Sequence, residues 1–271
     1  MSEEPRRPRR GLDTSVPNAA RMHDYLLGGK DNFAADREAA EAVLAIAPEV
    51  RAMAAETHAF QGRVLRYLLA EGMRQFLVLG VGLPSRHDSY DEVRAADPDA
   101  RLVYAARDAV VLSHARALLA GHPGTAVVEG DVLHPAELMA DHELRRVLDP
   151  ARPVAVLVPG ALNFIPEEDE PVKRIAELRD MLPAGSHLVL VHALFDVRPE
   201  VFAPILEIYK RTFKHTESAR RTREQVLRFF DGWELIEPGL VWVRQWRPDS
   251  PWAVRHPEQV WMAGAVGRKR D

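Results

Sequence analysis

The chain has 271 residues, a length that suits one large α/β domain or a domain with an appendage. Its hydrophobic fraction of 46% is ordinary for a globular protein, and acidic and basic residues are interspersed to a net charge of −4. This balance argues against a dedicated nucleic-acid-binding surface. The absence of cysteine excludes disulfides, thiolate metal sites and a cysteine nucleophile.

The amino-terminal residues form a basic run, Pro5–Arg10, which continues into Gly11–Thr14 rather than into the apolar core of a signal peptide. We therefore expect residues 1–14 to be a disordered basic tail, with a nucleic-acid arm as the alternative. The longest apolar stretch, Val154–Val158, falls far short of the ~20 residues of a membrane span. The sequence predicts a cytoplasmic protein with no membrane partner.

Helical patterns run from Pro17 to Gly72. Glycine and proline divide them into three helices, which end at Gly28–Gly29, at Pro48 and near Gly72. The second of these is expected over Phe33–Ala47. The third has one apolar face, made by Phe60, Val64, Tyr67 and Leu68.

After Gly72, short apolar runs alternate with helical patterns. Such runs are typical of strands buried on both faces. The helices between them include one capped by Asp108 and one beginning at Pro135. Five strands joined by helical crossovers predict a parallel sheet covered on both faces. The strands are expected at Gln75–Leu79, Leu102–Ala106, Ala126–Glu129, Val154–Val158 and His187–Val191.

The carboxy-terminal part predicts two helices and then three strand-like segments, Trp233–Glu237, Leu240–Val243 and Gln259–Val266. The turn at Pro238–Gly239 suggests a hairpin, so the sheet is expected to end antiparallel, as seven strands in the order 3-2-1-4-5-7-6. The five tryptophans are expected to pack in the core and hairpin, with a substrate wall as the alternative. They are Trp233, Trp242, Trp246, Trp252 and Trp261.

The first apolar run leads directly into a turn, Gly80-Val81-Gly82. Two glycines at this point let a ligand approach the backbone where a Cβ would block it, which suits a nucleotide-like cofactor; a tight turn is the other interpretation. A phosphate loop at Gly28-Gly29-Lys30 is ruled out by the residues at positions 24 and 31. The histidines lack metal-ligand spacing, so no metal site is expected.

This order of elements resembles a class I S-adenosylmethionine-dependent methyltransferase. The segment Pro17–Phe33 resembles the opening signature of a bacterial S-adenosyl methyltransferase family, formerly a domain of unknown function. The resemblance implies a Rossmann-like fold, with an amino-terminal helical lid at 15–72 and a sheet domain at 73–271. It also implies S-adenosylmethionine as cofactor and a small-molecule methyl acceptor. Further matches are Gly80–Pro84, Val110–Arg116, Phe229–Gly232 and Gly264–Lys269.

The same resemblance implies the site residues. Tyr25 and His23 are the bases that the lid offers, and Asn163 stands where the family often has histidine, although an amide positions rather than deprotonates. Asp108 is within reach of the ribose, with a helix N-cap as its other interpretation. The cofactor-binding candidates are Arg21, Gly80, Gly82, Asp108, Asp131 and Ala161.

Three positions depart from the family pattern. Val78 and Val81 replace an acid and a small hydroxyl residue around the first glycine, and Ala106 replaces the acid that holds the ribose. Losing that carboxylate removes roughly 1.5–3 kcal/mol of charge-assisted hydrogen bonding. A second hypothesis therefore stands beside the enzyme: a methyltransferase fold with weak or no cofactor binding that serves as an interaction protein. A nicotinamide-dependent reductase, using Arg107 on a 2′-phosphate, is a third.

Overall fold

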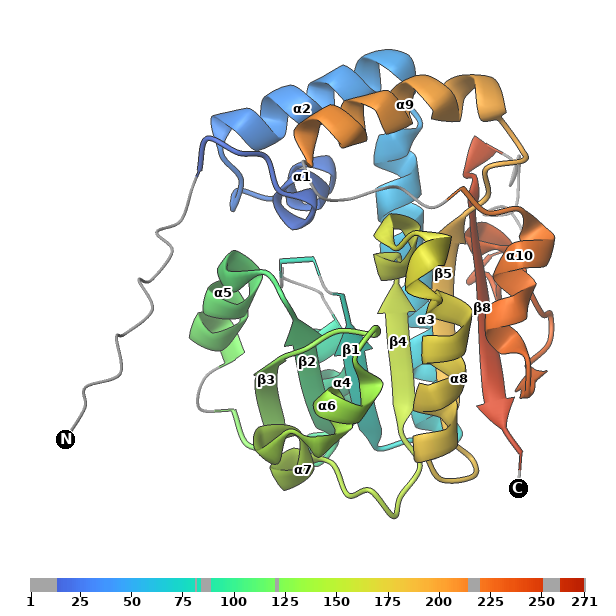
Figure 1. The fold of residues 1–271 in the computed structure, drawn as a ribbon. Helices are drawn as coiled ribbons and strands as arrows, with labels where there is room; N and C mark the ends of the chain where they lie inside the picture. Colours follow the sequence, from blue (N-terminus) through green and yellow to red (C-terminus); the bar gives the residue numbers. More distant parts are fainter. Residues whose placement is uncertain are drawn as a thin grey trace.

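The centre of the molecule is one sheet with helices on both faces (Figure 1). The computed structural model describes residues 14–80, 82–83, 89–119, 122–213, 220–250 and 259–270. Five parallel strands run in the order β3-β2-β1-β4-β5, and β8 (Met262–Lys269) follows β5 antiparallel. The parallel strands are β1 (Gln75–Leu79), β2 (Arg101–Ala106), β3 (Thr125–Glu129), β4 (Ala155–Pro159) and β5 (His187–Ala193). The Rossmann-like class I arrangement is confirmed.

The far edge of the sheet differs from the expected hairpin. Two short strands, β6 (Trp233–Leu235) and β7 (Val241–Trp242), both pair with β8. They lie one after the other along the same edge of β8, so the sheet has eight strands. Because β6 and β7 do not pair with each other, the predicted hairpin at Pro238–Gly239 is wrong. Pro238 has no N–H to donate to a strand ladder. A turn, closed by the hydrogen bond from Gly239 N to Ile236 O, therefore separates β6 from β7.

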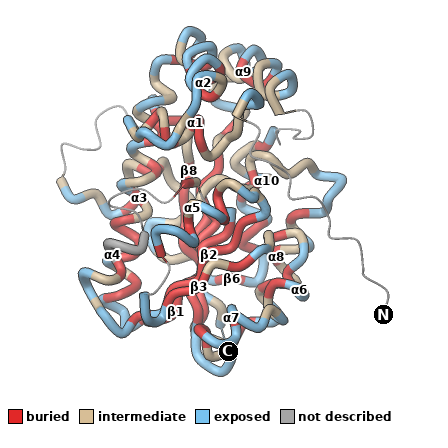
Figure 2. The backbone as a smooth tube through the Cα atoms, turned by 90° about the vertical axis from the view of Figure 1, so that its left-hand side faces the viewer, coloured by how far each residue is buried: buried red, intermediate tan, exposed pale blue. Residues whose placement is uncertain are grey.

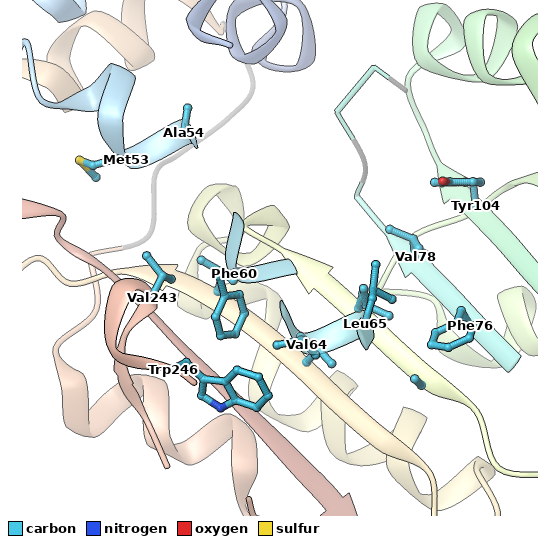
Figure 3. Close-up of a cluster of buried hydrophobic side chains, with 14 of the residues drawn as sticks. Met53, Ala54, Phe60, Val64, Leu65, Phe76, Val78, Tyr104, Val243 and Trp246 are labelled. Atoms are coloured by element: carbon cyan, nitrogen blue, oxygen red, sulfur yellow. The ribbon is translucent and has the colours of Figure 1, made fainter. Parts of the chain in front are cut away.

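Helix α3 (Val50–Ala70) covers one face of the sheet (Figure 3). Phe60, Val64 and Leu65 share a fully buried core with Phe76 and Val78 of β1. These strand residues alternate with Leu77 and Leu79, which face the opposite core together with helix α8 (Pro171–Met181). The buried residues in Figure 2 follow the sheet through the middle of the molecule. The fold therefore has three layers.

A further layer lies above the carboxyl ends of the parallel strands (Figure 1). It contains α1 (Ala19–Leu26), α2 (Ala34–Ile46) and α9 (Pro199–Thr212). Because α3 packs on the sheet, only α1 and α2 of the expected lid stand over the strand ends. The remaining helices are α4 (Ser89–Ala96), α5 (Ala109–Leu119), α6 (Pro135–Ala140), α7 (His142–Val147) and α10 (Arg223–Leu227), with short helices η1 (Ala161–Phe164), η2 (Glu167–Asp169), η3 (Arg228–Phe230) and η4 (Val243–Gln245).

The tryptophans serve the core as expected where the structure describes them. Trp246 and Trp261 are fully buried, Trp233 is nearly so, and Trp242 is half-buried against the core, whereas Trp252 lies outside the described residues. The expected basic tail also falls outside them, apart from Thr14. None of the described helices has the length and apolar character needed to cross a membrane.

Candidate functional site

The first glycine after β1 is required by the fold itself. Gly80 has a φ of +69°, a left-handed conformation that favours glycine. A Cβ built on it would lie 2.2 Å from Cβ of Ala161, the first residue of η1 after β4. The structure thus brings Gly80 and Ala161 together, and it explains Gly80 without a ligand.

The second glycine has no such explanation. The φ of Gly82 lies outside the left-handed region, and an added Cβ would meet only His23 Cδ2, at an ordinary 3.5 Å. Every other glycine for which the surroundings of an added Cβ are described has either a positive φ or an atom within 3 Å of that Cβ. Gly82 therefore exposes bare backbone beside the His23 imidazole, where neither the backbone nor the described packing requires a glycine.

His23 is half-buried on α1. Burial lowers the pKa of its imidazole to about 4, and the charge of nearby His58 lowers it in the same direction. The ring is therefore neutral at physiological pH.

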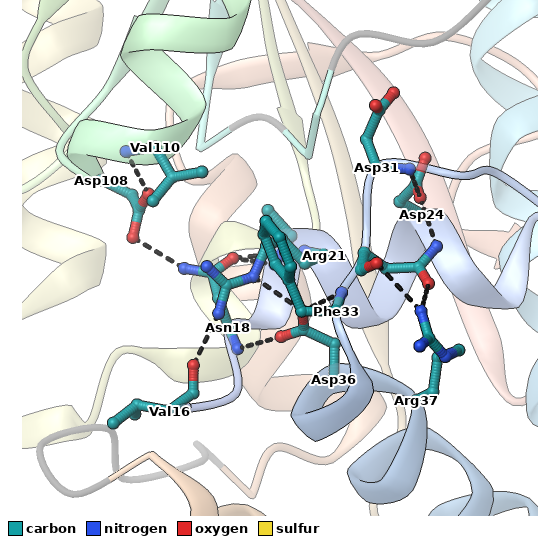
Figure 4. Close-up of polar contacts among 12 residues, drawn as sticks. Val16, Asn18, Arg21, Asp24, Asp31, Phe33, Asp36, Arg37, Asp108 and Val110 are labelled. Atoms are coloured by element: carbon teal, nitrogen blue, oxygen red, sulfur yellow. Dashed lines mark hydrogen bonds and ion pairs between the residues drawn. The ribbon is translucent and has the colours of Figure 1, made fainter. Parts of the chain in front are cut away.

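Asp108 follows β2 and caps α5 (Figure 4). Its Oδ1 accepts hydrogen bonds from the backbone N–H groups of Val110 and Val111 at 2.8 and 3.0 Å, which confirms the N-cap interpretation. Its Oδ2 accepts from Nδ2 of Asn18 at 2.7 Å. Because Asn18 in turn caps α1, this contact ties the beginning of α1 to the loop after β2.

Asp131, after β3, is also held by its surroundings. Its Oδ1 accepts from the backbone N–H groups of Leu133 and His134 at 3.0 and 3.1 Å, which closes a turn. Its Oδ2 pairs with Nη1 of Arg107 at 2.9 Å. Arg107 therefore has a counter-ion in the structure, and the carboxylate of Asp131 is engaged on both oxygens.

The position of the missing ribose acid is apolar. Ala106 is 7% exposed and packs with Leu83, Val111 and Leu112, and Ala20 of α1 covers the same cluster. Val78, on β1, lies deeper, in the core between the sheet and α3. Val81 lies outside the described residues.

Arg21 points into the helical segment instead of toward the strand ends (Figure 4). It is 1% exposed, and its Nε pairs with Oδ2 of the fully buried Asp36 at 2.8 Å. Its Nη2 donates to the carbonyl of Val16 at 2.6 Å, and its guanidinium stacks on the Phe33 ring. These contacts join α1 to α2.

Asp24 orders the Gly28–Asp31 loop in the same segment. Its Oδ2 accepts from Asp31 N and Asn32 Nδ2 at 2.9 and 2.8 Å. A Cβ on Gly29 would come within 1.9 Å of the Asp24 carboxylate, so this glycine makes room for the hydrogen-bonded loop.

Tyr25 contacts α2 and α3. Its hydroxyl lies 2.5 Å from Oε1 of Glu41, and the guanidinium of Arg51 lies over its ring. The hydrogen bond to Glu41 raises the pKa of the phenol, which therefore stays protonated at neutral pH. The described contacts do not bring Tyr25 to Gly82, unlike His23.

Asn163 links the ends of β4 and β5. Its Oδ1 accepts from Ala193 N at 2.9 Å, and its Nδ2 donates to the carbonyl of Gly160 at 3.0 Å. The oxygen and the nitrogen of the side-chain amide both form hydrogen bonds with backbone groups, so Asn163 orders η1.

A buried arginine that the sequence did not single out completes this region. Arg221 is fully buried and donates to the carbonyls of Leu162 and Ile165 at 2.6 and 2.8 Å. It also contacts Nε2 of His192 at 3.0 Å and pairs with Glu167 at 2.5 Å. Glu167 belongs to the short turn η2, before α8. No local motif marks Arg221, because its partners come from distant parts of the chain.

His192 is the second histidine of the strand ends. Its Nδ1 donates to the carbonyl of Ala193 at 2.7 Å, which leaves Nε2 to accept from Arg221. Burial, more than the nearby guanidinium, lowers its pKa to about 4. The ring is a neutral connector between β5 and Arg221.

A cavity of about 290 Å³ lies at the opposite, amino ends of the strands. Its lining includes Arg152 and Arg268 but also Glu71, next to the negative end of the α3 dipole. Arg74 lines the cavity as well, so positive charge predominates in this lining. In open α/β sheets, ligands bind at the carboxyl ends of the strands, so the Gly82 edge remains the candidate site.

The fold is that of the class I methyltransferases. The mitomycin 7-O-methyltransferase MmcR shares the fold at a TM-score of 0.51 and 16% identity, over 81% of this chain and 56% of that chain. The family model described as "S-adenosyl methyltransferase" matches residues 5–270. The chain belongs to this S-adenosyl methyltransferase family.

Two solved structures are similar over almost their whole length. A DUF574 family protein from Streptomyces avermitilis has a TM-score of 0.89 and 35% identity, covering 95% of this chain and 99% of that chain. A candidate methyltransferase from Thermobifida fusca has a TM-score of 0.88 and 36% identity, covering 97% and 99%. No curated protein matches the chain.

Proposed function

We propose that this protein transfers a methyl group from S-adenosylmethionine to a small-molecule acceptor. The observation that carries the proposal is Gly82, whose bare backbone faces His23 at the carboxyl end of β1 without a backbone or packing reason for glycine. A ligand that approaches this turn supplies the missing reason. Membership of the S-adenosyl methyltransferase family supports the identity of that ligand.

The residues around the turn fit the cofactor. Bare backbone at Gly82 suits its methionine end. The carboxylate of Asp108 is the acid nearest in sequence to the missing ribose ligand, and its Oδ2 is held by a neutral amide that a hydroxyl can replace. When bound, the cofactor supplies a methyl group activated by a positively charged sulfur.

The neutral state of His23 has a chemical consequence. A protonated imidazole would repel a sulfonium, whereas the neutral ring offers a lone pair or an N–H to the acceptor. With a pKa of about 4, His23 is a weak base, so we assign it to orienting the acceptor. Methyl transfer by direct displacement depends mainly on alignment and exclusion of water.

The other candidates take supporting roles in this proposal. Gly80 and Ala161 set the distance between the turns after β1 and β4, and Asn163 orders η1. Arg21, Tyr25 and Asp131 hold the elements around the site through the contacts described above. Helices α1, α2 and α9 shield the site from water.

Calorimetric titration with S-adenosylmethionine and S-adenosylhomocysteine tests the proposal. We expect binding by the natural protein and, because an added Cβ meets only His23 at van der Waals distance, a well-folded Gly82→Ala variant whose affinity falls by about tenfold, or 1.4 kcal/mol. Ala151→Val, on an exposed turn before β4, is the control that keeps full affinity. Absence of binding by the natural protein refutes the proposal, and equal affinities of natural protein and Gly82→Ala refute the placement of the cofactor.

A further inference from the structure

Three aromatic rings meet between η1 and α9. The centroid of the Phe164 ring lies 6.0 Å from that of Tyr209 and 6.4 Å from that of Phe213, and the last two lie 5.6 Å apart. All three residues are half-buried, so none of them is completely enclosed by the described part of the chain. We call these residues the aromatic triad.

The aromatic triad lies close to the proposed methyl donor site. Phe164 is the last residue of η1, and Ala161, the first, makes the close approach to Gly80. Its other two members lie on α9 and at its end, and α9 runs beside α2 in the layer above the strand ends (Figure 1). Asn163 and Arg221 fix the backbone that carries Phe164.

A second aromatic cluster near the beginning of α9 provides a comparison. Phe195, Phe202 and Trp261 pack with centroid distances of 5.7 and 5.1 Å. Guanidinium groups cover this cluster, because Arg220 stacks on Phe195 and Arg198 on Trp261. Among the described residues, no cation stacks on the aromatic triad.

The aromatic triad also carries one polar group. Burial raises the pKa of Tyr209 to about 12, so its hydroxyl stays protonated at physiological pH. This hydroxyl has no hydrogen bond to the described part of the chain. It is therefore a donor at the edge of an apolar surface, and apolar walls with a few polar groups are typical of small-molecule sites.

We infer that the aromatic triad binds the methyl acceptor and that the acceptor is a planar aromatic small molecule with a polar substituent. Flat rings stack or pack edge-on against aromatic side chains, which a puckered ring of equal size does less well. The substituent accepts a hydrogen bond from Tyr209. This inference rests on the proposed function for its chemistry, but ring binding is measured independently of methyl transfer.

Titration with 2-naphthol and with decahydro-2-naphthol, followed by NMR in the presence of S-adenosylhomocysteine, tests the inference. The two probes share a hydroxyl and a bicyclic skeleton and differ in planarity. We expect the natural protein to bind 2-naphthol at least about tenfold more tightly. Phe164→Leu should lower the affinity for 2-naphthol by about fivefold, and Tyr209→Phe by about threefold.

Phe195→Leu is the matched control, since it removes a half-buried ring from the covered cluster. We expect its affinity for 2-naphthol to stay within about twofold of the natural protein. Equal affinity for the two probes, or an equal loss in Phe164→Leu and Phe195→Leu, overturns the inference. If S-adenosylhomocysteine binds while planarity has no effect, the inference fails alone. If S-adenosylhomocysteine does not bind, the proposed function fails whatever 2-naphthol does.

Discussion

The two halves of the sheet's carboxyl edge are ordered by opposite charges. Around β1–β3, carboxylates accept hydrogen bonds: Asp108 caps α5, Asp131 closes a turn, and Asp36 binds the backbone N–H groups of Asn18 and Phe33. Around β4 and β5, one guanidinium donates hydrogen bonds, because Arg221 binds the carbonyls of Leu162 and Ile165. Loops with free N–H groups need acceptors, and loops with free carbonyls need donors.

This difference bears on how each half can change. In the β1–β3 half, several carboxylates share the hydrogen bonds to the backbone, and Asp108 also has a neutral partner, the Asn18 amide, that a ligand can replace. In the β4–β5 half a single side chain serves two carbonyls, an imidazole and a carboxylate. The first half is suited to adapting to a bound molecule, and the second to holding η1 rigid.

The largest expected effect is the loss of Arg221. In Arg221→Met, two carbonyls and Nε2 of His192 lose their donor, and we expect a loss of about 5 kcal/mol in the free energy of unfolding. Arg221→Lys keeps the charge but not the fork of donors and should lie in between. Denaturant titration measures both, with exposed Arg228→Met as control. A loss below about 1 kcal/mol would show that η1 does not depend on this residue.

The buried pair of Arg21 and Asp36 tests the other half. Asp36→Asn leaves the Arg21 charge unpaired and should cost about 3–4 kcal/mol of unfolding free energy. Arg21→Met combined with Asp36→Leu should recover part of this loss, because neither charge is then buried alone. A double-mutant cycle by denaturant titration measures the coupling. Equal stabilities of Asp36→Asn and the double variant would contradict the pairing seen in the structure.

Acid should weaken the β4–β5 half through His192. Its pKa is lowered from 6.5 to about 4 in the folded protein, so the unfolded chain binds a proton that the folded chain does not. Stability is therefore complete above about pH 6.5 and falls toward pH 4, by at most on the order of 3 kcal/mol from this residue. His192→Gln should flatten the pH dependence of unfolding, whereas exposed His142→Gln should leave it unchanged. An unchanged slope in His192→Gln would contradict the neutral state of His192.

The smallest effect is expected at Arg107. Its side chain is 62% exposed and pairs with Asp131, so Arg107→Ala should change the free energy of unfolding by less than about 1 kcal/mol. The Asp131 carboxylate keeps its two backbone N–H donors. Asp131→Ala removes those acceptors as well and should cost more. If Arg107→Ala proves the more damaging of the two in a thermal melt, the turn is held by the ion pair instead.

The parallel part of the sheet was predictable because its strands are recognisable in the sequence. The five parallel strands read as apolar runs, and the observed boundaries differ from the expected ones by no more than two residues. The edge was harder, since β6 and β7 are three and two residues long and their partner is β8, at least 20 residues further along the chain. On α5, Leu118 is 49% exposed although it is apolar, because Leu112 and Ala115 face inward instead.

For the site, the glycine turn, the N-cap at Asp108 and the family could be recognised from the sequence, because each depends on short motifs of consecutive residues. Only the tertiary structure decided the partners of the charged and aromatic groups. Arg221 meets Leu162 and His192, and Phe164 meets Tyr209, across dozens of residues of intervening chain. Gly80 and Gly82 look alike in the sequence. Ala161 occupies the space that a Cβ on Gly80 would need, whereas the corresponding space at Gly82 is open beside His23. Local spacing fixes backbone conformation, whereas packing between distant segments decides which polar groups are already satisfied and which remain for a ligand.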